Sequence, residues 1–164
     1  MNIFASIKVE IRFKKVVFYG VQMEGESESL FLQFIKKHAK ESKYRDDLDV
    51  LRTWLKKLGN EQGAKAWFFR NERAVLGLPP RQKYLETSCR IRLYCLRFND
   101  RAVMLFGGGV KTTARAQDCP FVGPAFKRAN QLGRAVDRAM KTKELCIDPE
   151  DGKLRFDANF KLYL

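Results

Sequence analysis

The chain has 164 residues, of which 45% are hydrophobic and 12% aromatic, and its formal net charge is +13. This composition is typical of one globular domain with its own core and excludes a disordered chain. The longest apolar runs, such as VVFYGV, are five or six residues, whereas a membrane span needs roughly 18. The segment MNIFASIKVEIRFKK alternates apolar with polar residues, unlike a secretory signal. We therefore expect a cytoplasmic protein without membrane contact.

The positive charge is concentrated in the middle of the chain. Residues 65–143 hold 17 Lys and Arg against 5 Asp and Glu, whereas residues 1–64 hold 12 against 9 and the last 21 residues hold 3 against 5. Such a concentration is typical of a protein that binds a polyanion. A basic surface that serves only solubility, or that an acidic partner protein neutralises, would give the same counts.

The first third of the chain predicts strands followed by two helices. Strict alternation from Ile7 onward indicates a strand, and VVFYGV after it indicates a more deeply buried one. The serines of GESES precede a helical segment, LFLQFIKKHAKES, in which His38 is expected at the surface or its boundary. A second helix is predicted over 45–58, with leucines at steps of three and four and with Gly59 as its stop.

The rest of the chain predicts antiparallel strands and one more helix. AKAWFF and ERAVLGL are interpreted as short strands ended by Pro79 and Pro80, and CRIRLYCLRF and AVMLF as a hairpin turned at 99–101. The glycines 107–109 are expected to end the second arm, in a backbone conformation that other residues rarely adopt. A helix is predicted over 124–142, and the tail supplies one candidate edge strand.

Helices segregated from a mostly antiparallel sheet define the α+β class. We expect an N-terminal strand and a helical hairpin packed on that sheet, followed by a C-terminal helix and a tail. The whole chain, 1–164, then forms a single domain, with 1–14 as an N-terminal extension and 145–164 as a C-terminal tail. These two segments either cover sheet edges or mediate dimerisation.

The four cysteines do not predict a metal site. Cys89, Cys95, Cys119 and Cys146 lack the short spacing of zinc-binding pairs, and the single histidine, His38, is remote in sequence. Reduced and mostly buried thiols fit a reducing compartment. We therefore expect no metal and no cofactor.

The predicted hairpin carries its charges at the ends of its strands. Arg90 and Arg92 fall on one face where the first arm begins, and antiparallel pairing places a residue near 108 opposite Arg92. Lys111 and the three glycines therefore lie beside both arginines at one end of the sheet. Two guanidinium groups, an ammonium group and glycine N–H groups make a candidate phosphate-binding site.

The stretch IRLYCLRFNDRAVMLFGGGVKTT, residues 91–113, resembles the RelE/ParE toxin superfamily. The shared features are a strand with I-R-L, a short turn, a strand of V-x-L-F type and a K-T-T loop. The similarity is greatest to the phage-derived Gp49-like / HigB-type branch. The helical hairpin upstream and the helix with A-x-x-R spacing downstream fit the same layout, over roughly residues 15–142.

This resemblance implies the toxin of a type II toxin–antitoxin system, a metal-independent endoribonuclease that cleaves mRNA, free or on the ribosome. In that reaction a 2′-hydroxyl attacks the adjacent phosphate. By motif position Arg92 is implied to hold the phosphate, and Lys111 to stabilise the transition state or donate a proton. The implied partners are a cognate antitoxin, mRNA and the ribosome, and oligomer formation stays open. The candidate substrate-binding residues are Arg90, Arg115, Arg128, Arg134 and Arg138.

The chain departs from this family in its acid–base residues. Many relatives carry a histidine or tyrosine near the C-terminus, or paired histidines, whereas this chain has only His38. Tyr94, Tyr163 and Asp157 are the remaining candidates, and Tyr94 is expected in the core. Two other functions therefore stay open. One is inhibition of DNA gyrase by a toxin of the same fold, and the other is a basic nucleic-acid- or protein-binding module without enzymatic activity.

Overall fold

The computed structural model describes residues 3–111 and 123–164. In these ranges the α-helices are α1 (Leu30–Ala39), α2 (Arg45–Lys57) and α3 (Gly123–Lys141). The strands are β1 (Phe4–Arg12), β2 (Val17–Met23), β3 (Arg70–Glu72), β4 (Val75–Leu78), β5 (Ile91–Asn99), β6 (Ala102–Val110), β7 (Cys146–Ile147), β8 (Leu154–Arg155) and β9 (Leu162–Tyr163).

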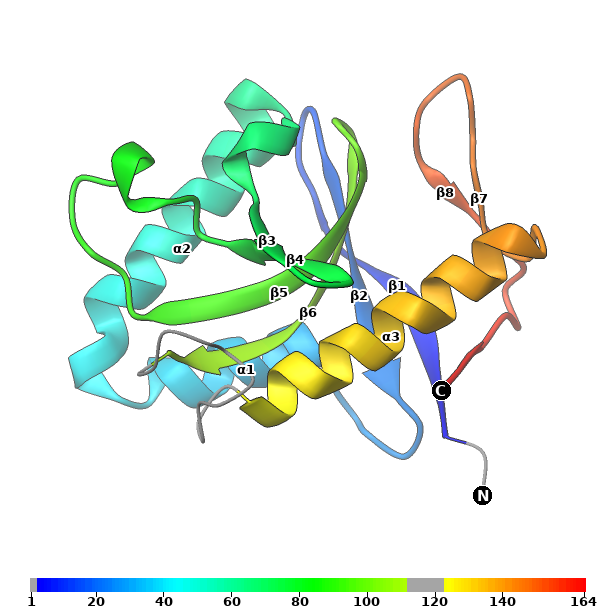
Figure 1. The fold of residues 1–164 in the computed structure, drawn as a ribbon, viewed down its shortest axis with the longest axis horizontal. Coiled ribbons are helices and arrows are strands. Elements are labelled where there is room, and N and C mark those ends of the chain that lie inside the picture. The colour runs from blue at the N-terminus through cyan, green and yellow to red at the C-terminus, as the bar shows by residue number, and fades with distance from the viewer. Residues whose placement is uncertain (1–2, 112–122) are drawn as a thin grey trace.

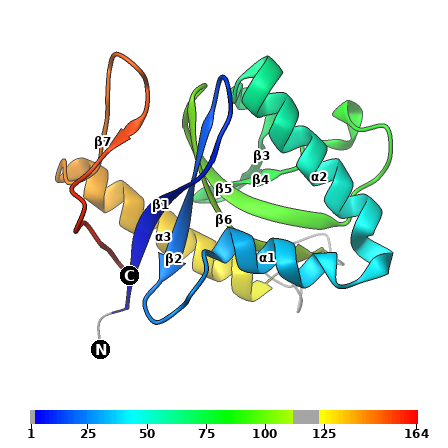
Figure 2. The ribbon, with the colours of Figure 1, turned by 180° about the vertical axis from the view of Figure 1, so that it is seen from behind.

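Seven of the described strands form one sheet, in the order β3-β4-β5-β6-β2-β1-β9, and β7 pairs only with β8. All pairs of this sheet are antiparallel except β2 with β6, which run parallel with Val17 opposite Ala102. Helices α1 and α2 cover one face, and α3 crosses the other (Figure 1; Figure 2). This arrangement confirms the predicted α+β class with its mostly antiparallel sheet.

The sheet is buried on both faces, which gives the domain two hydrophobic layers. Tyr94 and Phe106 pack with α3 on one face, whereas Leu93 and Leu105 pack with α1 and α2 on the other. Successive residues of β5 therefore enter opposite layers, as the alternation of side chains along a strand requires. Tyr94 is fully buried, so its predicted place in the core is confirmed.

Each helix presents one apolar side to the sheet. In α3, which has 19 residues, the buried positions include Phe126, Ala129 and Leu132, and the opposite side carries charged residues. The predicted capping of α1 is also confirmed, because the Ser29 hydroxyl accepts a hydrogen bond from the Leu32 N–H at 3.1 Å. Among the helices described, none is long and apolar enough to cross a membrane.

Three local predictions were wrong, and tertiary packing explains each. The α2 helix does not stop at Gly59 but continues in a π-helical turn to Gln62, and the left-handed residue is Gly63, with φ of 76°. Gly59 instead packs against Phe13, whose ring atom Cδ2 would lie 2.1 Å from an added Cβ.

The segment AKAWFF contains a 3₁₀ turn (Ala66–Phe68) where a strand was predicted. The Phe68 ring packs against Trp54 of α2, with centroids 5.3 Å apart, and this contact outweighs the local β propensity. His38 is not a surface residue: it is 3% exposed, and its Nδ1 lies 2.8 Å from the Phe34 carbonyl oxygen.

The two ends of the described chain cover a sheet edge. Strand β1 pairs along β2, and β9 pairs with β1 through Ala5 opposite Leu162. Arg138 of α3 donates a hydrogen bond to the Tyr163 carbonyl at 3.0 Å, which ties β9 to the helix. The edge strand predicted in the tail is thus confirmed, and it covers backbone groups that β1 would otherwise expose.

Candidate functional site

The glycines 107–109 do not end β6 but form part of it. Arg92 lies opposite Gly109, next to the expected position 108; the β5–β6 pairing shifts between Arg97 and Asn99 and shifts back between Leu93 and Cys95. The Lys111 N–H donates to the Arg90 carbonyl at 2.8 Å, so the pairing continues past the glycines. The backbone neighbours predicted for this end of the sheet are therefore observed.

The reason for glycine in this run is close packing of two strands. A Cβ on Gly108 would lie 1.8 Å from the Arg92 carbonyl oxygen. Positive φ among the described glycines occurs at Gly25, Gly63 and Gly152, and not in the run 107–109. The predicted special conformation is therefore wrong, and the close approach of β5 takes its place as the explanation.

Arg90 is bound to α2. Its Nη2 donates to Asp47 Oδ2 at 2.8 Å and to the Lys43 carbonyl at 2.7 Å, and its guanidinium lies over the Tyr44 ring. Asp47 is 5% exposed and also accepts from the Arg90 backbone N–H. The guanidinium groups of Arg90 and Arg92 therefore have different partners, and that of Arg90 is already held by a carboxylate.

We expect the Asp47→Ala substitution to lower the free energy of unfolding by about 2–3 kcal/mol. It removes a buried acceptor that serves both the backbone and the guanidinium of Arg90. Urea denaturation of the variant measures the loss. The matched control is Asp46→Ala, which removes an exposed acid from the same first turn and should cost less than about 1 kcal/mol. Equal losses in both variants would contradict this role of Asp47.

Among the described residues, the side-chain hydrogen bonds of Arg92 go to backbone carbonyls close to it in the sequence. Its Nη1 donates to the Cys89 carbonyl at 2.8 Å and to the Ile91 carbonyl at 3.0 Å. Its Nε is buried and has no hydrogen-bond partner among the residues described. The Arg92 side chain as a whole is half-buried, so part of the guanidinium remains accessible to a ligand although its Nε is enclosed.

Arg70, which the sequence did not single out, lies next to Arg92. It donates from Nε to the Pro79 carbonyl at 2.9 Å and from Nη2 to the Pro80 carbonyl at 3.0 Å. Burial lowers the pKa of Arg70, and the neighbouring charge of Arg92 lowers it further. Within residues 3–111 and 123–164, neither arginine forms an ion pair with a carboxylate. Two half-buried like charges are an arrangement that a bound anion would stabilise.

The other predicted residues lie in different places. Arg128 lines a groove of about 240 Å³ between α1 and α3, together with Lys37 and the glycines 107 and 108 of β6. Arg134 is exposed farther along α3, in a hollow shared with Arg97. Arg138 is exposed and bonds to β9, as described above. Arg115 lies outside the described residues. At the glycine end of the sheet, Arg92 therefore lies opposite Gly109 and near Arg70, and Lys111 follows two positions after Gly109. Arg128 lies in a groove with Gly107 and Gly108.

The acid–base candidates are separated from Arg92, with one exception. His38 and Tyr94 are buried in the core. Tyr163 belongs to β9, at the opposite edge of the sheet from β3 and β4, and Asp157 is exposed in the tail. Lys111, half-buried at the end of β6, is the candidate that the strand pairing places near Arg92.

Burial makes two of the cysteine thiols poorly reactive. Cys89 is 8% exposed and burial raises its pKa to about 11, and burial also raises the pKa of Cys95, which is fully enclosed. Both thiols therefore stay protonated at neutral pH, and the reactive species is the thiolate. Cys146 is exposed, and Cys119 lies outside the described residues.

We expect iodoacetamide at pH 7.5 to alkylate Cys146 of the folded protein at least about tenfold faster than Cys89 or Cys95. Peptide mass spectrometry of a time course gives the rate at each site. The same labelling in denaturant is the control, and there the three rates should become similar. Rapid alkylation of Cys89 in the folded protein would show that its thiol is not held as described.

Comparison of the chain with family models, with curated proteins and with solved structures gives no match. In the ranges that the structure describes, no three His, Cys, Asp or Glu side chains form a group that could hold a metal ion. Function is therefore inferred from the residues of this chain.

Proposed function

We propose that the chain is a metal-independent endoribonuclease, the toxin of a type II toxin–antitoxin pair, which binds the scissile phosphate of an mRNA at Arg92. The carrying observation is the pair of half-buried guanidinium groups, Arg70 and Arg92, which form no ion pair with a carboxylate among the described residues. Lys111 follows Gly109, the residue opposite Arg92, by two positions. The resemblance of residues 91–113 supplies the type of reaction. The order of strand, two helices, antiparallel strands and helix is the layout which that resemblance implies.

In the proposed reaction the 2′-hydroxyl loses its proton to solvent water, and its oxygen forms a bond to the adjacent phosphorus. The bond from phosphorus to the 5′-oxygen breaks, which leaves a 2′,3′-cyclic phosphate and a 5′-hydroxyl end. Negative charge on the phosphoryl oxygens grows in the transition state, and the half-buried Arg92 guanidinium with the neighbouring Arg70 charge would stabilise it. Lys111 would donate a proton to the leaving 5′-oxygen.

The charge of the remaining surface supports macromolecular partners. Arg128 and Arg134 extend the basic surface along α3, where ribosomal RNA would meet them. An acidic antitoxin laid across the same arginines would neutralise them and block access to Arg92. Mutual exclusion of antitoxin and RNA is therefore part of the proposal.

A second candidate function is a polyanion-binding module without catalysis. One observation favours it: His38 and Tyr94 are buried, so neither can accept the proton of the 2′-hydroxyl. The basic groups at the glycine end would then serve docking alone.

The decisive experiment is induced expression combined with mapping of RNA ends. The proposal predicts growth arrest and new mRNA ends that carry a 2′,3′-cyclic phosphate, produced by the purified protein on translating ribosomes or on free mRNA. DNA breaks with intact transcripts would instead assign the gyrase-directed function. Salt-sensitive RNA binding without any new ends would assign the binding module.

A further inference from the structure

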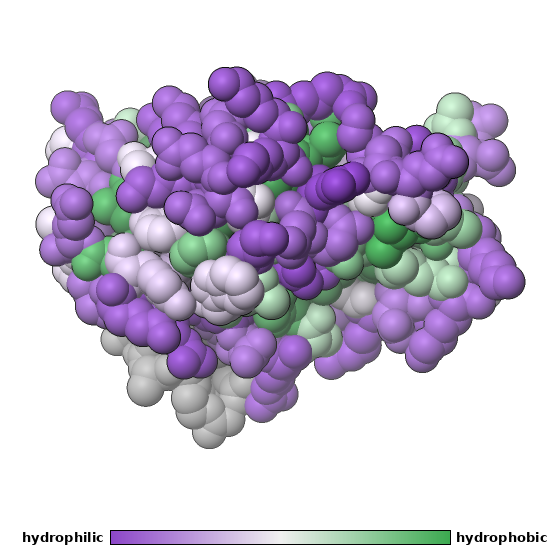
Figure 3. Space-filling model, turned by 90° about the horizontal axis from the view of Figure 1, so that it is seen from above, coloured by the Kyte–Doolittle hydropathy of each residue, from purple (hydrophilic) through white to green (hydrophobic). Residues whose placement is uncertain are grey.

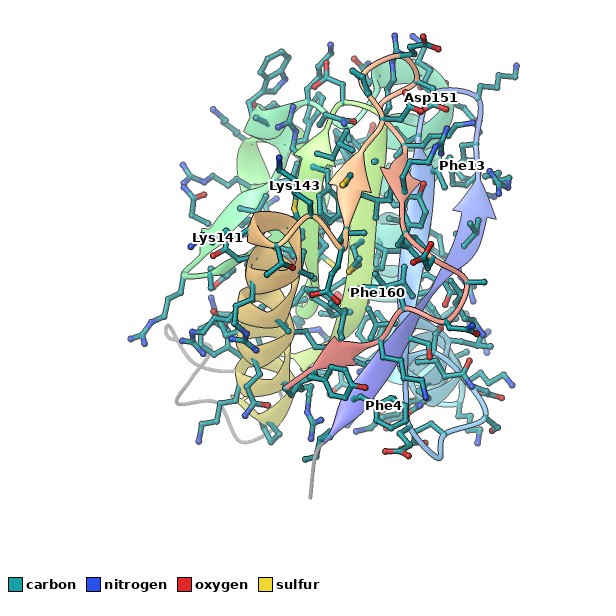
Figure 4. The ribbon with its side chains drawn as sticks, turned by 90° about the vertical axis from the view of Figure 1, so that its right-hand side faces the viewer. Phe4, Phe13, Lys141, Lys143, Asp151 and Phe160 are labelled. Carbon is teal, nitrogen blue, oxygen red and sulfur yellow. The ribbon has the colours of Figure 1, made fainter. Side chains whose placement is uncertain are left out.

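A hollow lies at the other end of the β5–β6 hairpin, away from Arg92. It has a volume of about 720 Å³, and four separate segments line it. These are the β1–β2 turn, the chain just after the π-helical turn, the β5–β6 turn and the β7–β8 hairpin, which all point upward in Figure 1. Figure 4 shows Phe13 and Asp151, from two of these segments, at the same end of the molecule. We call this hollow the turn-end cavity.

The lining of the turn-end cavity is strongly basic. Two carboxylates, Asp100 and Asp151, also line it. Seen from above, this end of the molecule is mostly hydrophilic (Figure 3). The cationic lining residues are Arg12, Lys14, Lys15, Lys65, Arg101 and Lys153.

Both carboxylates already have cationic partners. Asp100 is bound by Lys65 and by Arg97, whose Nη2 lies 2.6 Å from Oδ1, and these bonds lower the Asp100 pKa. Asp151 accepts a hydrogen bond from Arg155 at 2.6 Å. Neither carboxylate is therefore left to neutralise the other cations of the cavity.

Several cations of the cavity form no direct ion pair within the part of the chain that the structure describes. Within the described ranges, Arg12, Lys14 and Lys153 form no ion pair. Lys15 Nζ and Arg101 Nη1 donate to backbone carbonyls, at 2.6 and 3.4 Å, which carry no net charge. Like charges that line one concave surface focus a positive potential inside it.

The walls of the cavity are held together by hydrogen bonds between the segments. The Lys15 N–H donates to the Gly59 carbonyl at 2.7 Å, and the Ala64 N–H donates to the Asp100 carbonyl at 2.8 Å. Asn99 Nδ2 donates to the Gly152 carbonyl at 2.9 Å. These bonds hold the backbone of the walls together, so the segments that carry the cations are positioned before any ligand arrives.

We propose that the turn-end cavity binds a ligand that carries several phosphate groups, either a free oligophosphate such as a nucleotide carries or the backbone of a nucleic-acid strand. Phosphate oxygens match lysine ammonium groups and the planar fork of arginine. The volume falls in the range of small-ligand sites, roughly 300–1,000 Å³. The cavity and the Arg92 site share no residue, and this assignment does not depend on the endoribonuclease activity.

Calorimetric titration of the full chain tests the assignment, with inorganic triphosphate and a short single-stranded RNA as separate probes at about 0.15 M salt. The cavity variant is Arg12→Gln/Lys14→Gln/Lys153→Gln. Its control, Lys40→Gln/Arg52→Gln/Lys56→Gln, removes the same charge from exposed positions outside the cavity. We expect the Kd for triphosphate to rise at least about tenfold in the cavity variant and less than about twofold in the control. Equal melting temperatures of the two variants verify that both are folded.

Each outcome decides the assignment. Binding of RNA but not of triphosphate, lost in the cavity variant alone, would support the site and identify a nucleic-acid strand as the source of the phosphates. Equal weakening in the cavity variant and the control would overturn the site, because net charge alone would then explain binding. The absence of binding to both probes by the unaltered chain would also overturn it.

Discussion

The Arg92→Ala variant is expected to cleave RNA at least about 100-fold more slowly than the unaltered chain. The Arg92 guanidinium is half-buried, forms no ion pair with a carboxylate among the described residues, and is proposed to contact the phosphate when the negative charge on the phosphate is greatest. Its own bonds reach only the carbonyls of Cys89 and Ile91, so its removal should cost about 1 kcal/mol of stability and leave the fold intact. Initial rates on a reporter mRNA, measured with equal amounts of folded protein, give the loss.

Two further substitutions test whether the cleavage rate depends on the position and shape of the cationic group or only on the amount of positive charge. Arg92→Lys keeps the positive charge but loses the planar guanidinium group, which can bind two phosphate oxygens at once. This variant should therefore retain only part of the cleavage rate. Arg90→Ala should slow cleavage less than Arg92→Ala, because the Arg90 guanidinium is engaged by Asp47. Arg52→Ala, an exposed change on α2, serves as the control for net charge and should leave the rate unchanged. Growth arrest that persists in both the Arg92→Ala and the Lys111→Ala variants would contradict the assignment of these two residues to the active site.

The main elements could be predicted because local periodicity determines them. The alternation from Ile7 onward and the leucines at helical spacing in α2 are patterns that each segment carries in itself. The β5–β6 hairpin was also predictable, since its turn residues lie between two apolar runs. These elements limit the possible architectures to the α+β arrangement that is observed.

The candidate site was less predictable because it depends on contacts between distant segments. Arg70 reaches Arg92 through the pairing of β3 with β4 and of β4 with β5, in which Gly77 lies opposite both Arg70 and Tyr94. No local pattern near Arg70 reveals this. Arg90 immediately precedes β5, and Asp47, which is 43 residues away, determines where its side chain lies.

The basic middle of the chain is divided between two ends of one hairpin. Arg70, Arg92 and Lys111 lie at the glycine end, whereas Lys65 and Arg101 line the turn-end cavity. The cavity is also lined by Arg12 and Lys14 from the N-terminal part and by Lys153 from the tail. In these two parts of the sequence the counts of charged residues gave little or no excess of positive charge. Counts along the sequence therefore indicated a polyanion ligand but could not show that the cations form two separate groups.

The second large effect is expected for Gly108→Ala, which should lower the free energy of unfolding by about 3 kcal/mol or more. The new Cβ would lie 1.8 Å from the Arg92 carbonyl oxygen and 2.8 Å from its carbonyl carbon. These are backbone atoms of a central strand, so relief of the overlap requires β5 and β6 to move apart and not merely a change of rotamer. Urea denaturation followed by circular dichroism measures the loss.

Gly107→Ala is the matched control, because it adds the same methyl group one residue earlier in β6. Its Cβ would meet only the carbonyl oxygen and Cβ of Leu30, at 3.8 and 3.9 Å, which is ordinary van der Waals contact. We expect this variant to stay within about 1 kcal/mol of the unaltered chain. Similar losses at both positions would mean that glycine is needed here for flexibility along the whole run. A loss confined to Gly108 would show instead that it holds the Arg92 backbone close against β6, in the position that the proposed phosphate site requires.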